Sequence, residues 1–102
     1  MSGADFHGSV LVLPERTLDW PLRAVGKVTP ESLAPLLESE REVEILLLGC
    51  GEKLVLVPAE LRRQVRAAGP VLESMDTGAA CRTYNVLLSE ERRVGAALIA
   101  VG

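Results

Sequence analysis

The apolar positions of the chain fall into short runs that predict β-strands. Residues 9–14 form a run of valine and leucine that a proline ends, and we predict a strand there. Residues 20–28, which begin at the single tryptophan, are predicted to be a return strand that forms an antiparallel hairpin with the first, after a polar connection over residues 15–19. Residues 43–48 are almost continuously apolar, as is typical of a central strand covered on both faces. Two later apolar runs predict strands over residues 71–75 and 94–101.

Capping signals predict a short helix after the hairpin. Thr29-Pro30-Glu31 combines a capping hydroxyl, a proline at the first helical position and an acid in the first turn. Pro35 lacks a backbone N–H and would clash with the preceding turn. We therefore expect this helix to be short or kinked and to end near Ser39.

Two further helices complete the predicted order of elements. One is predicted to open at Pro58 and to stop at Gly69-Pro70, and Asp76 or Thr77 can cap the last helix. Residues 52–57 fit a short strand or an extended loop. The order β-β-α-β-α-β-α-β contains two β-α-β units, which favour a largely parallel sheet with right-handed crossovers. We therefore expect one α/β domain over residues 1–102, with residues 1–8 disordered.

Composition and charge exclude several classes of function. Of the 102 residues 48% are hydrophobic but only 3% aromatic, so the core is aliphatic and few rings are available to stack on bases. A formal net charge of −3 does not suit a phosphate-backbone binder, and we expect no nucleic-acid partner. No apolar run approaches the roughly 20 residues that cross a bilayer, so we expect no membrane insertion. The basic run of the second helix is interpreted as a solvated face (Arg62, Arg63 and Arg66).

Cysteine and histidine usage bears on location and metal binding. The first residues have neither the basic nor the apolar region of a signal peptide, so Cys50 and Cys81 are interpreted as reduced thiols of a cytoplasmic protein. Because His7 is the single histidine and lies far from both thiols, no zinc template fits, and we predict neither a metal nor a cofactor. The thiols could form a redox pair, but buried cysteines commonly behave as small apolar side chains.

Two turns at strand ends are the places where we expect chemistry. Ligands of α/β sheets bind at the carboxyl ends of strands and at nearby helix N-termini, where Gly49-Cys50-Gly51 and Asp76-Thr77-Gly78 lie. If the two strands are neighbours, one shallow cleft is lined by Cys50, Thr77, Arg82 and Asn85. The helix start and Arg82 could then hold a carboxylate or phosphate. The alternative is structural, because Gly-Cys-Gly lacks the third glycine of a dinucleotide fingerprint and Asp76 and Thr77 are ordinary helix caps.

Several segments of the chain also carry a family pattern. They are LLLGCG at 46–51, AAGP at 67–70, ESMDTGAACRTYNVL at 73–87 and GAALI at 95–99. Through them the chain resembles a family of small α/β proteins of largely unknown function, whose eukaryotic members include a mitochondrial assembly factor for complex I, the NADH:ubiquinone oxidoreductase. DTGAACRTYN, residues 76–85, is the most specific part of the match.

The resemblance implies a fold, a class of function and a set of site residues. The implied fold is a single three-layer α/β domain, with a mixed, mostly parallel central sheet, helices on one face and a β-hairpin layer on the other. Members of the family look like protein-interaction or assembly factors, so the resemblance implies no catalytic activity. Matched position by position, a pocket near the Gly-X-Gly turn would be formed by Gly49, Cys50, Gly51, Thr77, Thr83 and Asn85.

We therefore favour a non-enzymatic protein-interaction module that acts as an assembly factor for a respiratory membrane complex, with a protein partner still to be identified. Its mark would be an exposed apolar patch bordered by Arg82 or by the arginines of the second helix. The alternative is a small-anion-binding protein or an enzyme with its site at the Gly49–Gly51 turn and the helix start after Asp76. Homo-oligomerisation is left open. The candidate ligand-binding residues are Gly49, Cys50, Gly51, Thr77, Gly78, Arg82, Thr83 and Asn85.

Overall fold

The computed structural model of the protein describes residues 8–13, 16–22, 25–38, 43–52 and 55–100. Within these ranges five strands form one mixed sheet in the order β2-β1-β5-β3-β4. The strands are β1 (Ser9–Val12), β2 (Thr17–Trp20), β3 (Ile45–Gly49), β4 (Val71–Met75) and β5 (Val94–Leu98). The helices are α1 (Ala34–Leu37), α2 (Ala59–Ala68) and α3 (Thr77–Ser89), with short 3₁₀ turns η1 at Val25–Lys27 and η2 at Glu31–Leu33.

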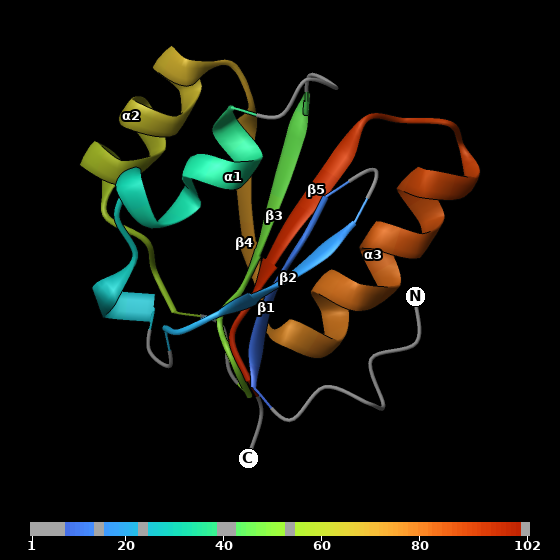
Figure 1. The fold of residues 1–102 in the computed structure, drawn as a ribbon, viewed down its shortest axis with the longest axis horizontal. Helices are drawn as coiled ribbons and strands as arrows, with labels where there is room; N and C mark the ends of the chain where they lie inside the picture. Colours follow the sequence, from blue (N-terminus) through green and yellow to red (C-terminus); the bar gives the residue numbers. More distant parts are fainter. Residues whose placement is uncertain (1–7, 14–15, 23–24, 39–42, 53–54, 101–102) are drawn as a thin grey trace.

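The predicted parallel centre of the sheet is confirmed. β3 pairs in parallel with both β4 and β5, whereas β1 pairs antiparallel with β5 and with β2. Figure 1 shows α1 and α2 on one face of this sheet and α3 on the other. Alternate β3 side chains serve the two faces: Leu46 lies in the core cluster with α1 and α2, and Leu47 packs with Tyr84 of α3. This double coverage explains why the strand is almost continuously apolar.

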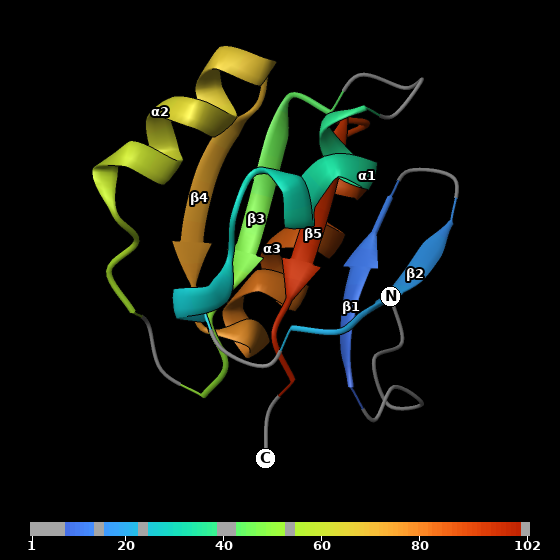
Figure 2. The same ribbon diagram turned by 60° about the vertical axis from the view of Figure 1, so that its left-hand side comes forward.

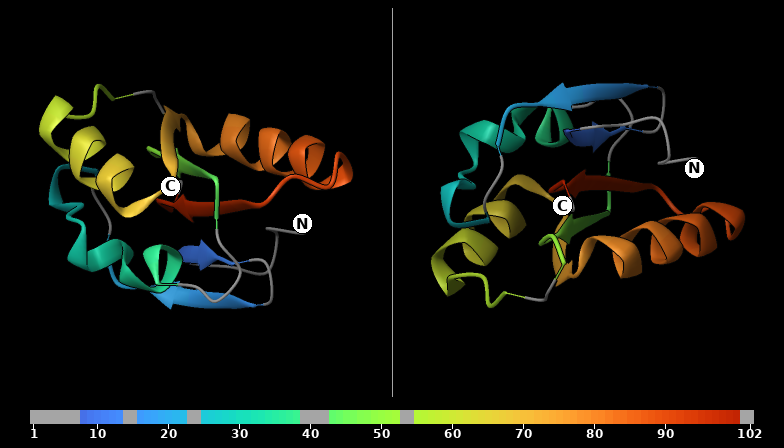
Figure 3. Two further views of the ribbon diagram at one scale, coloured as in Figure 1. Left: turned by 90° about the horizontal axis from the view of Figure 1, so that it is seen from above. Right: turned by 90° about the horizontal axis from the view of Figure 1, so that it is seen from below.

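The arrangement of the layers differs from the one that the family resemblance implied. The β1–β2 hairpin is not a separate layer, because β1 pairs with β5 and so extends the sheet (Figure 2). All four residues of β1 are buried, as expected for a strand inside a sheet that has helices on both faces. Helices therefore cover both faces, and the hairpin lies at one side of the molecule, away from α2 and α3 (Figure 3).

The return strand of the hairpin lies earlier in the chain than predicted. Val12 pairs with Thr17, and the backbone N–H of Leu13 donates to the carbonyl of Arg16 at 2.7 Å, so the chain reverses at once. The expected strand over residues 20–28 is wrong: β2 ends at Trp20, and Val25–Lys27 is a 3₁₀ turn. β2 resembled a polar connection because it is an edge strand with exposed polar residues, including Asp19.

The predicted capping hydroxyl of Thr29 bonds within the 3₁₀ turn that precedes the first helix, whereas the α-helix itself begins later, at Ala34, without a side-chain cap. The backbone N–H of Thr29 donates to Ser32 Oγ at 3.0 Å, and the N–H of Ser32 donates to Thr29 Oγ1 at 3.2 Å. A 3₁₀ turn leads into a single α-helical turn that carries Pro35 near its start and ends at Leu37. The predicted end near Ser39 lies outside the described residues. The predicted disorder of residues 1–8 concerns residues that, except for Gly8, also lie outside them.

The remaining elements lie close to their predicted positions. α2 and β4 match the predicted ranges, and α3 begins directly after its cap, Asp76. Residues 55–58 are an irregular segment, so the loop alternative holds there, and β5 ends at Leu98, before the predicted end. Trp20 is buried, and its indole N–H donates to the carbonyl of Ser32 at 3.0 Å, which ties β2 to the start of the first helix.

Candidate functional site

The two predicted turns meet at the carboxyl ends of adjacent parallel strands. Gly49 of β3 lies opposite Met75 of β4. The backbone N–H of Cys50 donates to the carbonyl of Met75 at 2.8 Å, and the N–H of Thr77 donates to the carbonyl of Gly51 at 2.8 Å. The two strands are therefore neighbours, which is the condition on which the predicted cleft depends.

The Thr77 side chain fills the junction between these turns. Its hydroxyl donates to the carbonyl of Ile99 at 2.7 Å and accepts the backbone N–H of Gly51 at 2.9 Å. One side chain thus joins the chain after β3, the start of α3 and the chain after β5. We call this arrangement the Thr77 latch. A hydroxyl that both donates and accepts within the protein has little capacity left for a ligand.

Gly49 is needed for the close packing of the latch. A Cβ atom at this position would lie 2.9 Å from both Cα and Oγ1 of Thr77, and 3.1 Å from Cδ2 of Leu98. Gly51 has a φ of +97°, in the left-handed region that glycine adopts without strain. The glycines of the predicted phosphate-cradling turn are therefore explained by packing and backbone conformation.

The start of α3 is capped from within the protein. Asp76 Oδ1 accepts the backbone N–H of Ala79 at 2.8 Å, as a helix N-cap does. A Cβ atom on exposed Gly78 would lie 3.5 Å from Nη1 of Arg82, so the guanidinium of Arg82 reaches back toward the first turn. Thr83 is half-buried, with its hydroxyl 3.5 Å from Sδ of Met75.

Apart from half-buried Thr83, the candidate residues therefore separate into two groups. Gly49, Cys50 and Gly51 are buried and Thr77 is half-buried, and all four belong to the closed strand-end junction. Gly78, Arg82 and Asn85 are exposed along the outer side of α3. On the same helix Val86 retains 55% and Leu88 49% of their accessible surface. The structure thus presents these polar side chains on a helix surface beside large apolar ones.

The two cysteines lie on opposite faces of the sheet. Cys50 belongs to the core cluster with α1 and α2, and its Sγ lies 3.8 Å from the carbonyl oxygens of Leu48 and Val55. Cys81 packs against the cluster beneath α3, and partial burial raises the pKa of its thiol. With the sheet between them, the two thiols do not form a redox pair within one molecule.

In the basic run on α2 only Arg62 is half-buried, whereas Arg63 and Arg66 are exposed, as the interpretation of a solvated face expects. The guanidinium of half-buried Arg62 donates to the carbonyl of Leu72 at 2.8 Å and to Ser74 Oγ at 2.9 Å, so its interpretation as part of a solvated face is wrong. Arg63 pairs with Glu60, and Arg66 donates to the carbonyl of Gly69 at 2.6 Å. These contacts leave α3 as the better candidate for a binding surface.

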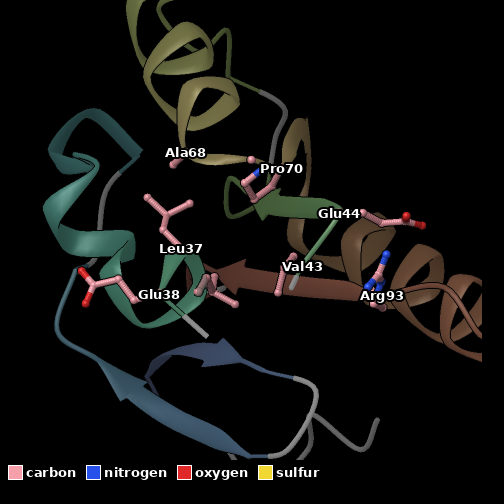
Figure 4. A pocket seen from close by; sticks show the side chains of 9 residues that line it. Leu37, Glu38, Val43, Glu44, Ala68, Pro70 and Arg93 are labelled. Carbon is pink, nitrogen blue, oxygen red and sulfur yellow. The ribbon is translucent and has the colours of Figure 1, made fainter. Parts of the chain in front are cut away.

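A pocket of about 500 Å³ lies at the other end of the parallel strands, where sequence reasoning did not look (Figure 4). It is lined by Leu36, Leu37, Glu38, Val43, Glu44, Ala68, Gly69, Pro70 and Arg93. Arg92 donates to Glu44 Oε1 at 2.7 Å, and this bond holds the pKa of the Glu44 carboxyl below its ordinary value. The lining residues are common apolar and charged side chains, with one glycine, from four separate segments, so no motif could have predicted the pocket.

These features define a class: a small mixed α/β protein whose strand-end junction is closed by a threonine and whose last helix exposes a mixed polar and apolar surface. A family model described as a protein of unknown function (DUF498/DUF598) matches residues 1–99, and the chain belongs to this family. Among the described residues, no helix is long and apolar enough to span a bilayer.

Named relatives extend this assignment. The chain is 34% identical over 99 residues to the zebrafish (Danio rerio) NADH dehydrogenase (ubiquinone) 1 alpha subcomplex assembly factor 3, covering 97% of this chain and 57% of the relative. The chain thus spans little more than half the length of that protein. A Bartonella henselae structure described as an outer membrane protein shares 37% identity with a TM-score of 0.85, covering 97% of this chain and 85% of the other. A Bordetella pertussis structure described as an Mth938-like domain shares 31% identity with a TM-score of 0.75, over 90% and 73% of the two chains.

Proposed function

We propose that the protein is a non-enzymatic, cytoplasmic interaction module that assists assembly of a respiratory NADH dehydrogenase, and that it docks on its partner through the outer side of α3. The observation that carries the proposal is the separation of the site residues. Thr77 is committed to the latch, whereas Arg82 and Asn85 are exposed beside Val86. The class of partner is taken from relatives at about a third sequence identity, which are named as assembly factors of NADH dehydrogenase.

The composition of the α3 surface suits a protein partner. Val86 lies four residues after Arg82, so the two side chains are neighbours on the helix, and Asn85 lies beside them. An exposed valine next to an arginine is a common centre for a protein interface, since arginine is enriched at interfaces and apolar area supplies the burial. We expect the partner to present an acidic side chain to Arg82 and an apolar surface to Val86.

The test is capture of the tagged protein from a lysate of its source organism, followed by identification of the proteins that accompany it. The double variant Arg82→Glu/Val86→Asp is compared with Arg16→Glu/Leu56→Asp, which makes the same change in charge at exposed positions outside α3. We expect the unchanged protein and the control to capture NADH dehydrogenase subunits or their assembly proteins, and the α3 variant to lose them.

Two results would contradict the proposal. Equal capture by the α3 variant and its control would place docking elsewhere, and a partner set unrelated to the respiratory complex would remove the assigned role. Circular dichroism of both variants separates lost docking from lost folding. The anion-binding alternative predicts that inorganic phosphate shifts the backbone resonances of residues 76–79, a titration that needs no partner.

A further inference from the structure

The outer edge of β4 is one of the two edges of the sheet, and its backbone is oriented for pairing with another strand. The N–H of Val71 donates to the carbonyl of Glu44, and the carbonyl of Met75 accepts the N–H of Cys50, so these β4 residues face β3. Because adjacent residues of a parallel strand direct their polar groups to opposite sides, Leu72 and Ser74 direct theirs outward. Such an edge is a template for strand addition unless something blocks it.

Arg62 of α2 occupies this outward side. Its Nη1 lies 2.8 Å from the carbonyl oxygen of Leu72, and its Nη2 lies 2.9 Å from Ser74 Oγ. The neighbouring helix residues Leu61 and Val65 are buried in the core, which fixes α2 beside β4 and holds the arginine over the edge. The planar guanidinium uses two donors at once, a geometry that lysine cannot reproduce.

Glu73 adds a second obstacle to one particular kind of pairing. Identical strands associate most simply by antiparallel pairing about a two-fold axis. The two copies then run in opposite directions, and the residue on the axis lies opposite its own copy. If Leu72 of one copy pairs with Ser74 of the other, the two exposed Glu73 side chains lie opposite each other. Like charges at opposed positions destabilise a strand pair.

We propose that Arg62 is a gatekeeper that closes the β4 edge against strand addition by a second copy of this chain, with Glu73 opposing the symmetric register. Removal of Arg62 opens the carbonyl of Leu72 and removes the guanidinium from the Ser74 hydroxyl, so that an antiparallel β4–β4 contact can form. Val71, with 42% of its surface exposed, would gain burial at the same contact. This inference concerns the edge of the sheet and does not depend on the function proposed for α3.

Sedimentation velocity over a wide range of concentrations tests the proposal. The variants are Arg62→Gln, which keeps much of the side chain, and Arg62→Gln/Glu73→Thr, which also removes the repulsion. Arg63→Gln is the matched control, because Arg63 is exposed and pairs with Glu60 on the same helix. We expect the unchanged protein and the control to sediment as monomers, the single variant to associate with rising concentration, and the double variant to approach twice the monomer mass.

Amide hydrogen exchange locates the contact. In the associated double variant the Leu72 and Ser74 amides should exchange more slowly than in the unchanged protein, while amides of β2 at the opposite edge keep their rates. Circular dichroism establishes that the variants are folded. Folded Arg62 variants that stay monomeric, an association that leaves the Leu72 and Ser74 amides unprotected, or an unchanged protein that already dimerises through β4 would each overturn the proposal.

Discussion

At the scale of single residues, the contact between Gly49 and Thr77 decides what the strand-end turn can do. The two residues are so close that the turn has no room for a side chain at position 49. The same closeness lets the Thr77 hydroxyl bridge Gly51 and Ile99. A glycine-containing turn that looks like a ligand cradle in sequence is therefore a packing solution for three converging segments.

Replacement of Gly49 by alanine should destabilise the protein. The added Cβ would meet the backbone and side chain of Thr77 at 2.9 Å, and backbone cannot move aside cheaply. We expect Gly49→Ala to lower the free energy of unfolding by about 1–3 kcal/mol, measured by urea unfolding with Trp20 fluorescence. Gly26→Ala is the control, because nothing lies within 4 Å of its Cβ position, and it should stay within about 0.5 kcal/mol. Equal stability of the two variants would contradict the latch geometry.

The hydroxyl of Thr77 should contribute stability independently of its methyl group. Thr77→Val keeps the shape of the side chain but leaves the carbonyl of Ile99 and the N–H of Gly51 without this partner. We expect a loss of about 1–3 kcal/mol in the same urea measurement, because half-buried polar groups lose their bonds. Thr77→Ser retains the hydroxyl and should lose less. A valine variant as stable as the serine variant would show that the two bonds contribute nothing.

Sequence reasoning identified these residues but not their role. The proximity of Gly49 and Thr77 follows from parallel strands that end at the same level, a rule that needs only the order of elements. The partner of the Thr77 hydroxyl is the carbonyl of Ile99, 22 residues later, and no local pattern encodes it. Arg62 was misread for the same reason, since its acceptors at Leu72 and Ser74 belong to another element.

At the scale of elements, a strand could be predicted from the sequence when the sheet buries it. β3 could be predicted because a strand covered on both faces needs an unbroken apolar run. β2 could not, because an edge strand exposes Thr17 and Asp19, and its composition matches that of a loop. α1 was correctly predicted to be short, since Pro35 acts through backbone chemistry that does not depend on tertiary contacts.

An ion pair links the starts of two elements and should give stability a pH dependence. Arg92, just before β5, donates to Glu44, just before β3, and this bond lowers the pKa of the carboxyl from its ordinary value of 4.5. A lowered folded-state pKa gives stabilisation that is present above the unfolded pKa and is lost as pH falls through the folded one. The protein should therefore exceed Glu44→Gln in stability at neutral pH, by a small margin because both groups are exposed, and the margin should vanish in acid.

Thermal unfolding of the unchanged protein and of Glu44→Gln, from neutral pH to well below the ordinary carboxyl pKa of 4.5, measures the effect. The stability of Glu44→Gln/Arg92→Gln should change with pH in the same way as that of Glu44→Gln, because the ion pair is already broken in the single variant. A margin that persists unchanged at acidic pH would mean that Glu44 stabilises the fold by something other than its charge.

At the scale of the whole molecule, helices on both faces leave few surfaces for function. The family resemblance implied a hairpin layer over one face of the sheet. Instead, β1 pairs with β5, so the hairpin belongs to the sheet, and helices cover both faces. Arg62 of α2 is bonded to residues of β4, and the strand-end turn is closed by Thr77. The outer side of α3 then combines exposed polar residues from the family motif with exposed apolar area.

The most direct test of this account is site-specific photo-crosslinking in cells of the source organism. A photo-reactive p-benzoylphenylalanine is introduced at Val86 on α3 or, as a control, at Leu56, which is 88% exposed and lies before α2. The account predicts a covalent adduct with a respiratory-complex subunit or assembly protein from position 86 and none from position 56. Adducts from position 56 alone, or the same adducts from both positions, would contradict docking through α3.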